Sequence, residues 1–247
     1  MRIGRLPCAA GLLLLSTVLA GCTSTVTGAA SPVGGASAAP TGTAAPTGPP
    51  APDSAQLQAA EVQLADLPSG WTAGTGAEFD GAMMDTFAEC LGRPESPGDR
   101  LMEAGSPAFS DASGHGVHSS AVSYRSATVV DSVAALFRAP KAAACFTQGV
   151  LTELADTTVP PGASLGTPHV VVTPGSGGGP DNVVATAAVR LPVVTQAGAA
   201  VTVYADFVVL RGRTTTALLG LGSFGAPLSR EVRDPVVQAL ARRIAPL

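Results

Sequence analysis

The chain has 247 residues and a formal net charge of −4, with 46% apolar and 13% charged residues. Loss of residues 1–21, interpreted below as an export signal, leaves 18 acidic and 12 basic residues, because Arg2 and Arg5 leave with it. An exported protein of this modest acidity meets no nucleic acid, so we expect no nucleic-acid partner.

The N-terminus has the pattern of a secretory signal. Arg2 and Arg5 precede an apolar run from Ala9 to Ala20, which matches the charge and length of such a segment. The run is too short to span a hydrocarbon core, which requires about 20 apolar residues. We therefore expect residues 1–21 to be a signal peptide and not a membrane-spanning helix.

The sequence Leu19-Ala20-Gly21-Cys22 ends that run with small residues and a cysteine. It matches a bacterial lipobox, which is cut before the cysteine. The alternative is a signal cut elsewhere, with Cys22 merely nearby. The lipobox predicts that Cys22 is the lipid attachment site. Acyl chains such as palmitate would hold the protein on the extracytoplasmic face of the cell membrane, each buried methylene contributing about 0.8 kcal/mol.

A linker and one globular domain are expected after Cys22. Residues 23–52 are almost entirely Thr, Ser, Gly, Ala and Pro and carry no charged or aromatic side chain, so they cannot bury enough surface to fold. We assign 22–52 to the lipidated cysteine plus a disordered tether. Residues 53–247 are long enough for a single domain with its own core.

Two of the four cysteines remain for the domain, because Cys8 leaves with the signal and Cys22 takes the lipid. An exported protein folds in an oxidising compartment, where disulfides persist. The expected bridge joins Cys90 to Cys145, and the alternative is two separate buried thiols. Such a bridge would stabilise the domain by roughly 4 kcal/mol in the chain-entropy model.

Apolar residues at helical spacing predict five helices. Asp80 is the expected N-cap of the second helix, and Thr128 with Asp131 forms a capping-box-like start for the third. Pro235 is expected to kink or restart the last helix, with Asp234 as a cap. The predicted helices cover about residues 57–67, 83–91, 129–137, 142–154 and 228–244.

Residues rich in β-branched side chains predict a strand at 117–126 and four more in the last third of the chain, at 169–172, 183–194, 199–210 and 214–221. The short connections 196–198 and 211–213 favour antiparallel hairpins. In the strand 199–210 the expected core face carries Val201, Val203, Ala205, Phe207 and Val209.

These elements predict an α+β fold: a single domain in which an antiparallel sheet, with a C-terminal meander, packs one face against several helices. Trp71, the sole tryptophan, is expected to anchor the core. Residues 93–116 are expected to be irregular.

Two glycine patterns imitate catalytic motifs. The segment from Gly220 to Gly225 matches a dinucleotide-binding pattern, but that motif needs a further parallel strand and an acidic residue about 20 positions on. We interpret it as a strand-to-helix turn. Residues 162–166 match a nucleophile elbow, but flanking prolines exclude the strand-turn-helix context. Only His169 follows as a possible base.

Two imidazoles and a carboxylate, from His115, His118 and Asp111, could bind a metal ion. A metal site, however, usually requires a third or fourth ligand in fixed geometry. We expect exposed loop histidines. The glycine-rich residues 175–179 lack the lysine of a phosphate-binding loop. The sequence thus predicts no catalytic, cofactor-binding or metal-ligating residue, and no cofactor.

Residues 64–71, Leu-Ala-Asp-Leu-Pro-Ser-Gly-Trp, resemble the opening of actinobacterial sensor-domain lipoproteins, which are similar to the extracellular domain of PknH-type serine/threonine kinases. The helix around Cys145 and the ending 207–213 plus a terminal helix fit the same pattern. The resemblance implies a mixed fold with a central cleft that binds an envelope ligand. The kinase-linked domains carry two bridges, whereas this chain offers one.

Two classes of function remain. The first is a non-catalytic binding or sensing lipoprotein, whose partner is a small envelope ligand or a protein. The second is a carrier of a lipid or other apolar ligand, suggested by the mean hydropathy of +0.33. A carrier should contain an apolar pocket of several hundred Å³. An enzyme is the third and weakest reading.

Overall fold

The computed structural model describes residues 51–74, 82–93, 96, 98–155, 159, 161–175 and 179–247. The helices among them are α1 (Ser54–Ala60), α2 (Ala82–Cys90), α3 (Ala127–Leu136), α4 (Ala142–Ala155) and α5 (Arg230–Ile244), with a 3-10 turn, η1 (Leu64–Asp66). In this described part, no helix combines the length and hydropathy needed to cross a membrane. Cys22, the tether up to residue 50 and the expected cap Asp80 lie outside the described residues.

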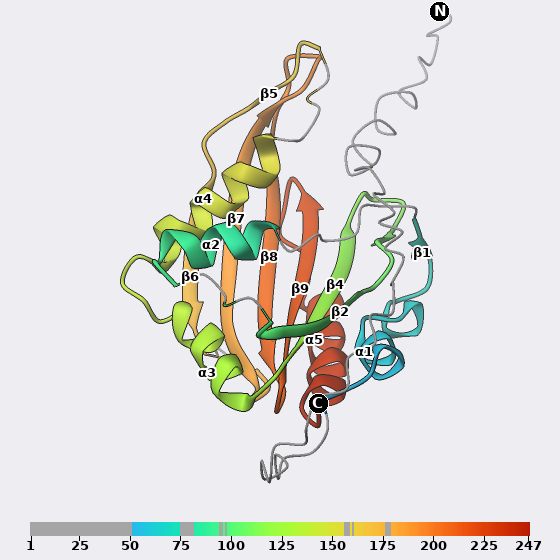
Figure 1. Ribbon diagram of the computed structural model, residues 1–247. Helices are drawn as coiled ribbons and strands as arrows, with labels where there is room; N and C mark the ends of the chain where they lie inside the picture. Colours follow the sequence, from blue (N-terminus) through green and yellow to red (C-terminus); the bar gives the residue numbers. More distant parts are fainter. Residues whose placement is uncertain are drawn as a thin grey trace, which may run out of the picture.

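One antiparallel sheet organises the domain (Figure 1). Its central order is β4-β9-β8-β7; β2 and β3 pair with successive parts of β4, and β5 and β6 with successive parts of β7. The strands are β1 (Thr72–Ala73), β2 (Arg100–Gly105), β3 (Phe109–Ser110), β4 (Gly116–Tyr124), β5 (Ser164–Leu165), β6 (His169–Pro174), β7 (Val183–Val194), β8 (Ala200–Arg211) and β9 (Thr215–Phe224). The predicted C-terminal meander is confirmed as β7-β8-β9.

Helices cover both faces of this sheet. Figure 1 shows α2, α3 and α4 on one side and α5 on the other. We call these the α4 face and the α5 face. Neighbouring side chains of a strand point to opposite faces. Leu218 accordingly belongs to the core of the α4 face and Leu219 to that of the α5 face. The prediction that helices pack against one face of the sheet is therefore wrong in that point, because helices cover both faces.

On the α5 face, the first helix of the domain meets the last. Leu57 of α1, Trp71, and Val236 and Leu240 of α5 pack with β4 and β9 in one cluster. Trp71 is 7% exposed, which confirms its predicted role as a core anchor. Arg243 of α5 donates hydrogen bonds to the backbone oxygens of Ala60 and Glu61, so α5 holds the end of α1 directly.

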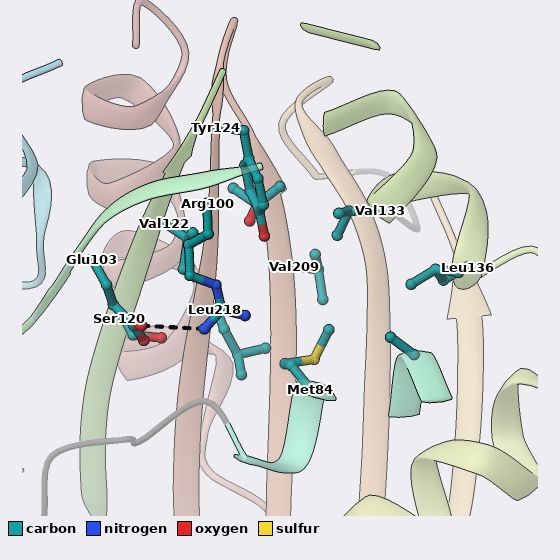
Figure 2. A pocket seen from close by; sticks show the side chains of 13 residues that line it. Met84, Arg100, Glu103, Ser120, Val122, Tyr124, Val133, Leu136, Val209 and Leu218 are labelled. Carbon is teal, nitrogen blue, oxygen red and sulfur yellow. Dashed lines mark hydrogen bonds and ion pairs between the residues drawn. The ribbon is translucent and has the colours of Figure 1, made fainter. Parts of the chain in front are cut away.

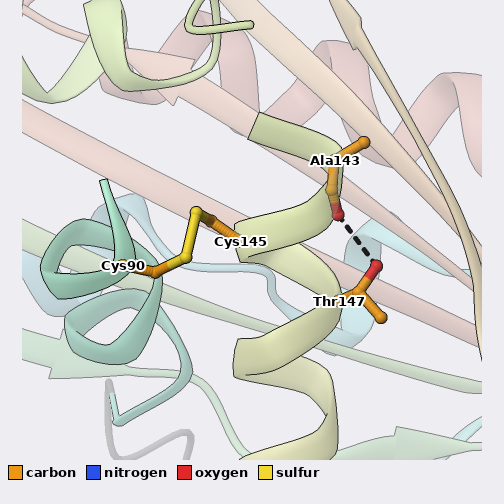
Figure 3. The surroundings of a disulfide bond; sticks show 4 residues. All are labelled: Cys90, Ala143, Cys145 and Thr147. Carbon is orange, nitrogen blue, oxygen red and sulfur yellow. Dashed lines mark hydrogen bonds between the residues drawn. A yellow bond between two sulfur atoms is a disulfide. The ribbon is translucent and has the colours of Figure 1, made fainter. Parts of the chain in front are cut away.

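The α4 face has an aromatic core built around Phe87, Phe137 and Phe146, which are each at most 1% exposed. The ring centroids of Phe87 and Phe137 are 4.8 Å apart. The predicted Cys90–Cys145 bridge is confirmed, with Cα atoms 5.4 Å apart, and Figure 3 shows it joining α2 to α4. A disulfide requires Cα atoms about 4.4–6.8 Å apart, and this pair meets that requirement. Cys145 is buried, whereas Cys90 lies at the exposed end of α2.

Coverage of both faces corrects the predicted core of β8. Val201, Val203 and Ala205 are only half-buried, whereas Val208 and Leu210 of the opposite side are 1% and 0% exposed. Alternation predicts which residues share a face, but it cannot show that both faces are covered at one end of a strand.

Helix α5 continues through Pro235, so of the two predicted outcomes, a kink or a restart, the restart does not occur. The proline removes the hydrogen bond to residue 231. Val236, Leu240 and Ile244 are nevertheless completely buried. Their burial against the sheet keeps the helix in one piece, and Ser229, not Asp234, takes the N-cap position.

Two further expectations change. Helix α3 begins two residues earlier than predicted, because the Oγ of Ser126, which is in extended backbone conformation, accepts a hydrogen bond from the Val129 amide. Residues 93–116, expected to be irregular, contain strands β2 and β3. These strands are ordered by pairing with β4, a long-range interaction that leaves little local signal.

Candidate functional site

A small hollow lies on the α4 face between the sheet, α2 and α3 (Figure 2). Its volume is about 40 Å³. The apolar lining comes from all three walls: Met84 and Ala88 of α2, Val133 and Leu136 of α3, and Val209 and Leu218 of the sheet. We call this cavity the inner hollow.

The polar groups of the inner hollow come from β4, β9 and β2. Ser120, Val122 and Tyr124 are alternate residues of β4, so they point to the same face. Ser120 pairs with Leu218 and Val122 with Thr216 of β9 in the sheet register. The strand register thus places the hydroxyl-bearing residues Ser120, Tyr124 and Thr216 beside an apolar floor.

Arg100 of β2 lies at the inner hollow and links β2 to α2. Its guanidinium forms ion pairs with Asp85 of α2 at 2.9 Å and with Glu103 at 3.4 Å. Figure 2 shows the Arg100–Glu103 pair beside Ser120 and Leu218. The Asp85 side chain is 53% exposed, so this ion pair contributes at most about 1 kcal/mol. It is a weak latch between helix and strand.

Helix α2 is joined far more firmly to α4 than to the sheet. The disulfide fixes its C-terminal end, and Glu153 of α4 accepts a hydrogen bond from the Met83 amide at its other end. Between them, α2 lies so close to Gly149 that a Cβ there would be 2.7 Å from the Met83 carbonyl oxygen. The α2 wall of the inner hollow is therefore part of a helix pair, α2 and α4, that the disulfide joins. We call it the stapled pair.

A second polar centre lies on the α5 face. Glu61 is completely buried; its carboxylate accepts a hydrogen bond from Ser119, and one of its oxygens has no partner among the described residues. Burial raises the pKa of Glu61 to about 7, opposed by the Ser119 hydrogen bond and by the charge of Arg243. The guanidinium of Arg243 is held instead by Asp66, at 2.6 Å.

That ion pair also sets the ionisation of Asp66. Partial burial alone would raise the pKa of Asp66. Hydrogen bonds from Arg243 and the Gln63 amide outweigh this and hold the pKa below its usual range. Asp66 thus remains charged and holds the Arg243 guanidinium, which also donates a hydrogen bond to the backbone oxygen of Glu61.

The structure separates the residues that imitate catalytic motifs. Gly220 and Gly222 lie within β9, which runs to Phe224, so the expected strand-to-helix turn begins only after them. Gly220 is opposite His118 of β4, and a Cβ there would lie 2.4 Å from the His118 ring. The glycine makes room for a histidine. Ser164 lies in β5, an exposed edge strand, and His169 in β6.

The prediction that His115 and His118 are both exposed loop residues is wrong for His118. His115 lies between β3 and β4, where its Nδ1 is 2.8 Å from the Asp111 carboxylate and its ring stacks on Trp71. His118 lies within β4, and burial lowers its pKa to about 4. Among the described residues, no group of three or more metal-ligating side chains is present.

Neither the Arg100–Asp85 ion pair nor the buried carboxylate of Glu61 was predicted from the sequence. Glu61 stood in the apolar stripe of the first predicted helix, between Leu57 and Val62, and that position is the only local signal of its burial. Arg100 had no such signal, because its partner Asp85 becomes a neighbour only through packing.

Comparison with solved structures finds a similarity to a sensor domain of a kinase, whereas the comparisons of sequence find none. No family model matches the chain, and no curated protein matches it. The crystal structure of the extracellular domain of PknH from Mycobacterium tuberculosis superposes with a TM-score of 0.43 and 10% identity, covering 79% of this chain and 98% of that one. The predicted resemblance to a PknH-type extracellular domain thus has a structural counterpart, and the predicted lipoprotein family stays a prediction.

Proposed function

We propose that the chain is an extracytoplasmic lipoprotein whose domain binds a small ligand in the inner hollow and has a sensing role without catalysis. The observation that carries the binding part is the hollow itself, an apolar space between the sheet, α3 and α2, the helix that the disulfide joins to α4, with the Arg100–Asp85 ion pair beside it. Ligand sites in proteins combine an apolar lining with a few polar groups that fix orientation.

The inner hollow suits recognition of a ligand. Ser120, Thr216 and Tyr124 supply hydroxyl groups, and Arg100 with Glu103 supplies one charged pair. Because the Arg100–Asp85 pair is weak and exposed, it adds little to the cost of separating α2 from β2. Ligand binding would then shift the position of the stapled pair α2 and α4, which is a change that a partner protein can detect.

The alternative function, a carrier of a lipid or other apolar ligand, requires more space. A cavity of about 40 Å³ is well below the roughly 300–1,000 Å³ typical of ligand pockets. An acyl chain would enter only if α2 and α4 moved away from the sheet together. The size of the hollow therefore favours a small ligand over a lipid.

A cavity-filling variant tests the binding site. Ala88→Leu adds a branched side chain to the wall of the hollow, and Ala88→Ser is the matched control that keeps its size. We expect native mass spectrometry of protein purified from its own envelope to show a bound mass in wild type and in A88S but not in A88L. An acyl lipid as that mass would favour the carrier. Equal occupancy in A88L would refute the hollow as the site.

The anchor is tested separately at Cys22. We expect Cys22→Ala to leave the precursor uncut or to move the protein from the detergent phase to the aqueous phase in a phase-partition assay, because the acyl chains would be lost. Cys8→Ala is the matched control, since Cys8 lies in the predicted signal. Normal processing and membrane attachment of C22A would exclude the lipobox.

A further inference from the structure

A second hollow lies on the outside of the domain, where the ends of α2 and α3 come together before α4. It has a volume of about 300 Å³. Leu91 and Arg93 line it after α2, Leu136 lines it at the end of α3, and Arg138 and Pro140 line it between α3 and α4. We call it the arginine groove. It is separate from the inner hollow, although Leu136 contributes to both.

The two arginines differ from most others in the domain. Arg100, Arg125, Arg211, Arg233 and Arg243 each form an ion pair with a carboxylate. Within the described ranges, neither Arg93 nor Arg138 has such a pair, and both side chains are exposed. Two arginines thus line one groove, and no carboxylate of the described residues forms an ion pair with either.

The floor of the groove is apolar. Leu136 is 5% exposed, and Leu91 packs against the aromatic core beneath. Pro140 and two alanines complete the lining. A free inorganic anion would gain from the arginines alone, whereas a ligand with an apolar body would also remove this floor from water.

The disulfide holds the two walls together. Cys90 is three residues before Arg93. Cys145, in the first turn of α4, is seven residues after Arg138. The backbone on both sides is also tied down, because the amide of Arg93 bonds to Ala88 and that of Arg138 to Ala135. Walls fixed in this way need little reorganisation to bind, which lowers the cost of association.

We propose that the arginine groove is a binding site for a small soluble molecule that carries a carboxylate or phosphate on a compact apolar body. Guanidinium groups bind both oxyanions through paired, charge-assisted hydrogen bonds. The volume is at the lower end of the range for ligand pockets, so the apolar body is small. This site is additional to the inner hollow and does not depend on it.

Calorimetric titration of the full chain in a nonionic detergent tests the proposal. The probes are phenyl phosphate and phenylacetate, with benzyl alcohol and inorganic phosphate as half-ligands that lack the charge or the apolar body. We expect the two complete probes to bind at least about tenfold more tightly than either half-ligand. Equal binding of benzyl alcohol, equal binding of inorganic phosphate, or no binding of phenyl phosphate would each overturn the proposal.

Variants locate the site. Arg93→Gln and Arg138→Gln should each weaken phenyl phosphate binding about three- to fivefold, as expected for exposed ion pairs. Arg213→Gln, at an exposed arginine of the β8–β9 turn, is the matched control and should change nothing. The same loss in R213Q would show a nonspecific charge effect and refute the groove.

Two further measurements distinguish this proposal from two alternatives, binding in the inner hollow and contact with a membrane. A88L, which fills the inner hollow, should leave phenyl phosphate affinity unchanged, so the two sites fail or succeed independently. Phosphatidylglycerol vesicles should bind R93Q and R138Q as well as wild type. If vesicle binding instead depends on the two arginines and the soluble probes do not bind, the groove is a membrane contact and the proposal is wrong.

Discussion

On the α5 face the first and last helices of the domain meet, and they are held by apolar burial, by the Arg243–Asp66 pair and by hydrogen bonds of Arg243 to the end of α1. On the α4 face two helices that are also distant in sequence are joined by a covalent bond. The α5 face contains a buried carboxylate, whereas the α4 face contains both hollows. The two faces should therefore respond to different perturbations, one to pH and the other to reduction.

The largest effect is expected from removing the disulfide. Cys90→Ser, Cys145→Ser and the double variant should each lower the free energy of unfolding by about 2–5 kcal/mol, because each removes the same cross-link. Denaturant unfolding of the oxidised protein measures this. Losses that add up in the double variant would contradict a single shared cross-link. The loss should not depend on pH, since nothing on the α5 face has changed.

Glu61 should give the α5 face a pH-dependent stability. Its pKa is raised from 4.5 to about 7 in the folded state. The stabilisation is therefore complete below pH 4.5 and is lost as the pH rises to 7, because the folded state then has to bury a charge. The shift corresponds to roughly 3 kcal/mol.

The test is thermal unfolding of Glu61→Gln between pH 4 and 8. The amide keeps the shape but does not ionise, so we expect the decline of stability over that range to flatten. Asp85→Asn, at an exposed carboxylate of the α4 face, is the matched control and should retain the wild-type slope. An unchanged slope in E61Q would show that Glu61 does not titrate in this range.

A smaller effect is expected at Gly149, where α2 and α4 cross. A Cβ at this position would lie 2.7 Å from the Met83 carbonyl oxygen and 3.0 Å from its side chain. Crowding of this kind costs about 1–3 kcal/mol, and the better helix propensity of alanine offsets about 1 kcal/mol. We expect Gly149→Ala to destabilise the domain by up to about 2 kcal/mol in denaturant unfolding.

A second helical position serves as the control for that variant. Ser132→Ala changes an exposed residue of α3 and should be nearly neutral. Gly149→Ala combined with Cys90→Ser should cost less than the sum of the two, because α2 can move away from α4 once the bridge is absent. Full additivity would show that α2 is held in place by the sheet and not by α4.

Local patterns predicted those parts of the fold that each segment specifies by itself. The spacing of Phe146, Val150 and Leu154 predicted α4, and the β-branched runs predicted β6 to β9. The disulfide followed from the small number of cysteines in the domain. The candidate site could not be predicted in this way, since the inner hollow takes its walls from α2, α3, β2, β4, β8 and β9.

Amino-acid sequence by itself determined the helix and strand types, the hairpins of the meander and the pairing of Cys90 with Cys145, because periodicity and residue count are local properties. Tertiary structure alone decided that both faces of the sheet are covered, that α5 continues through Pro235 and that Glu61 is buried. In each of these cases the deciding free energy comes from surface that is buried only when distant segments meet. A helix propensity or a strand pattern contains no information about that partner.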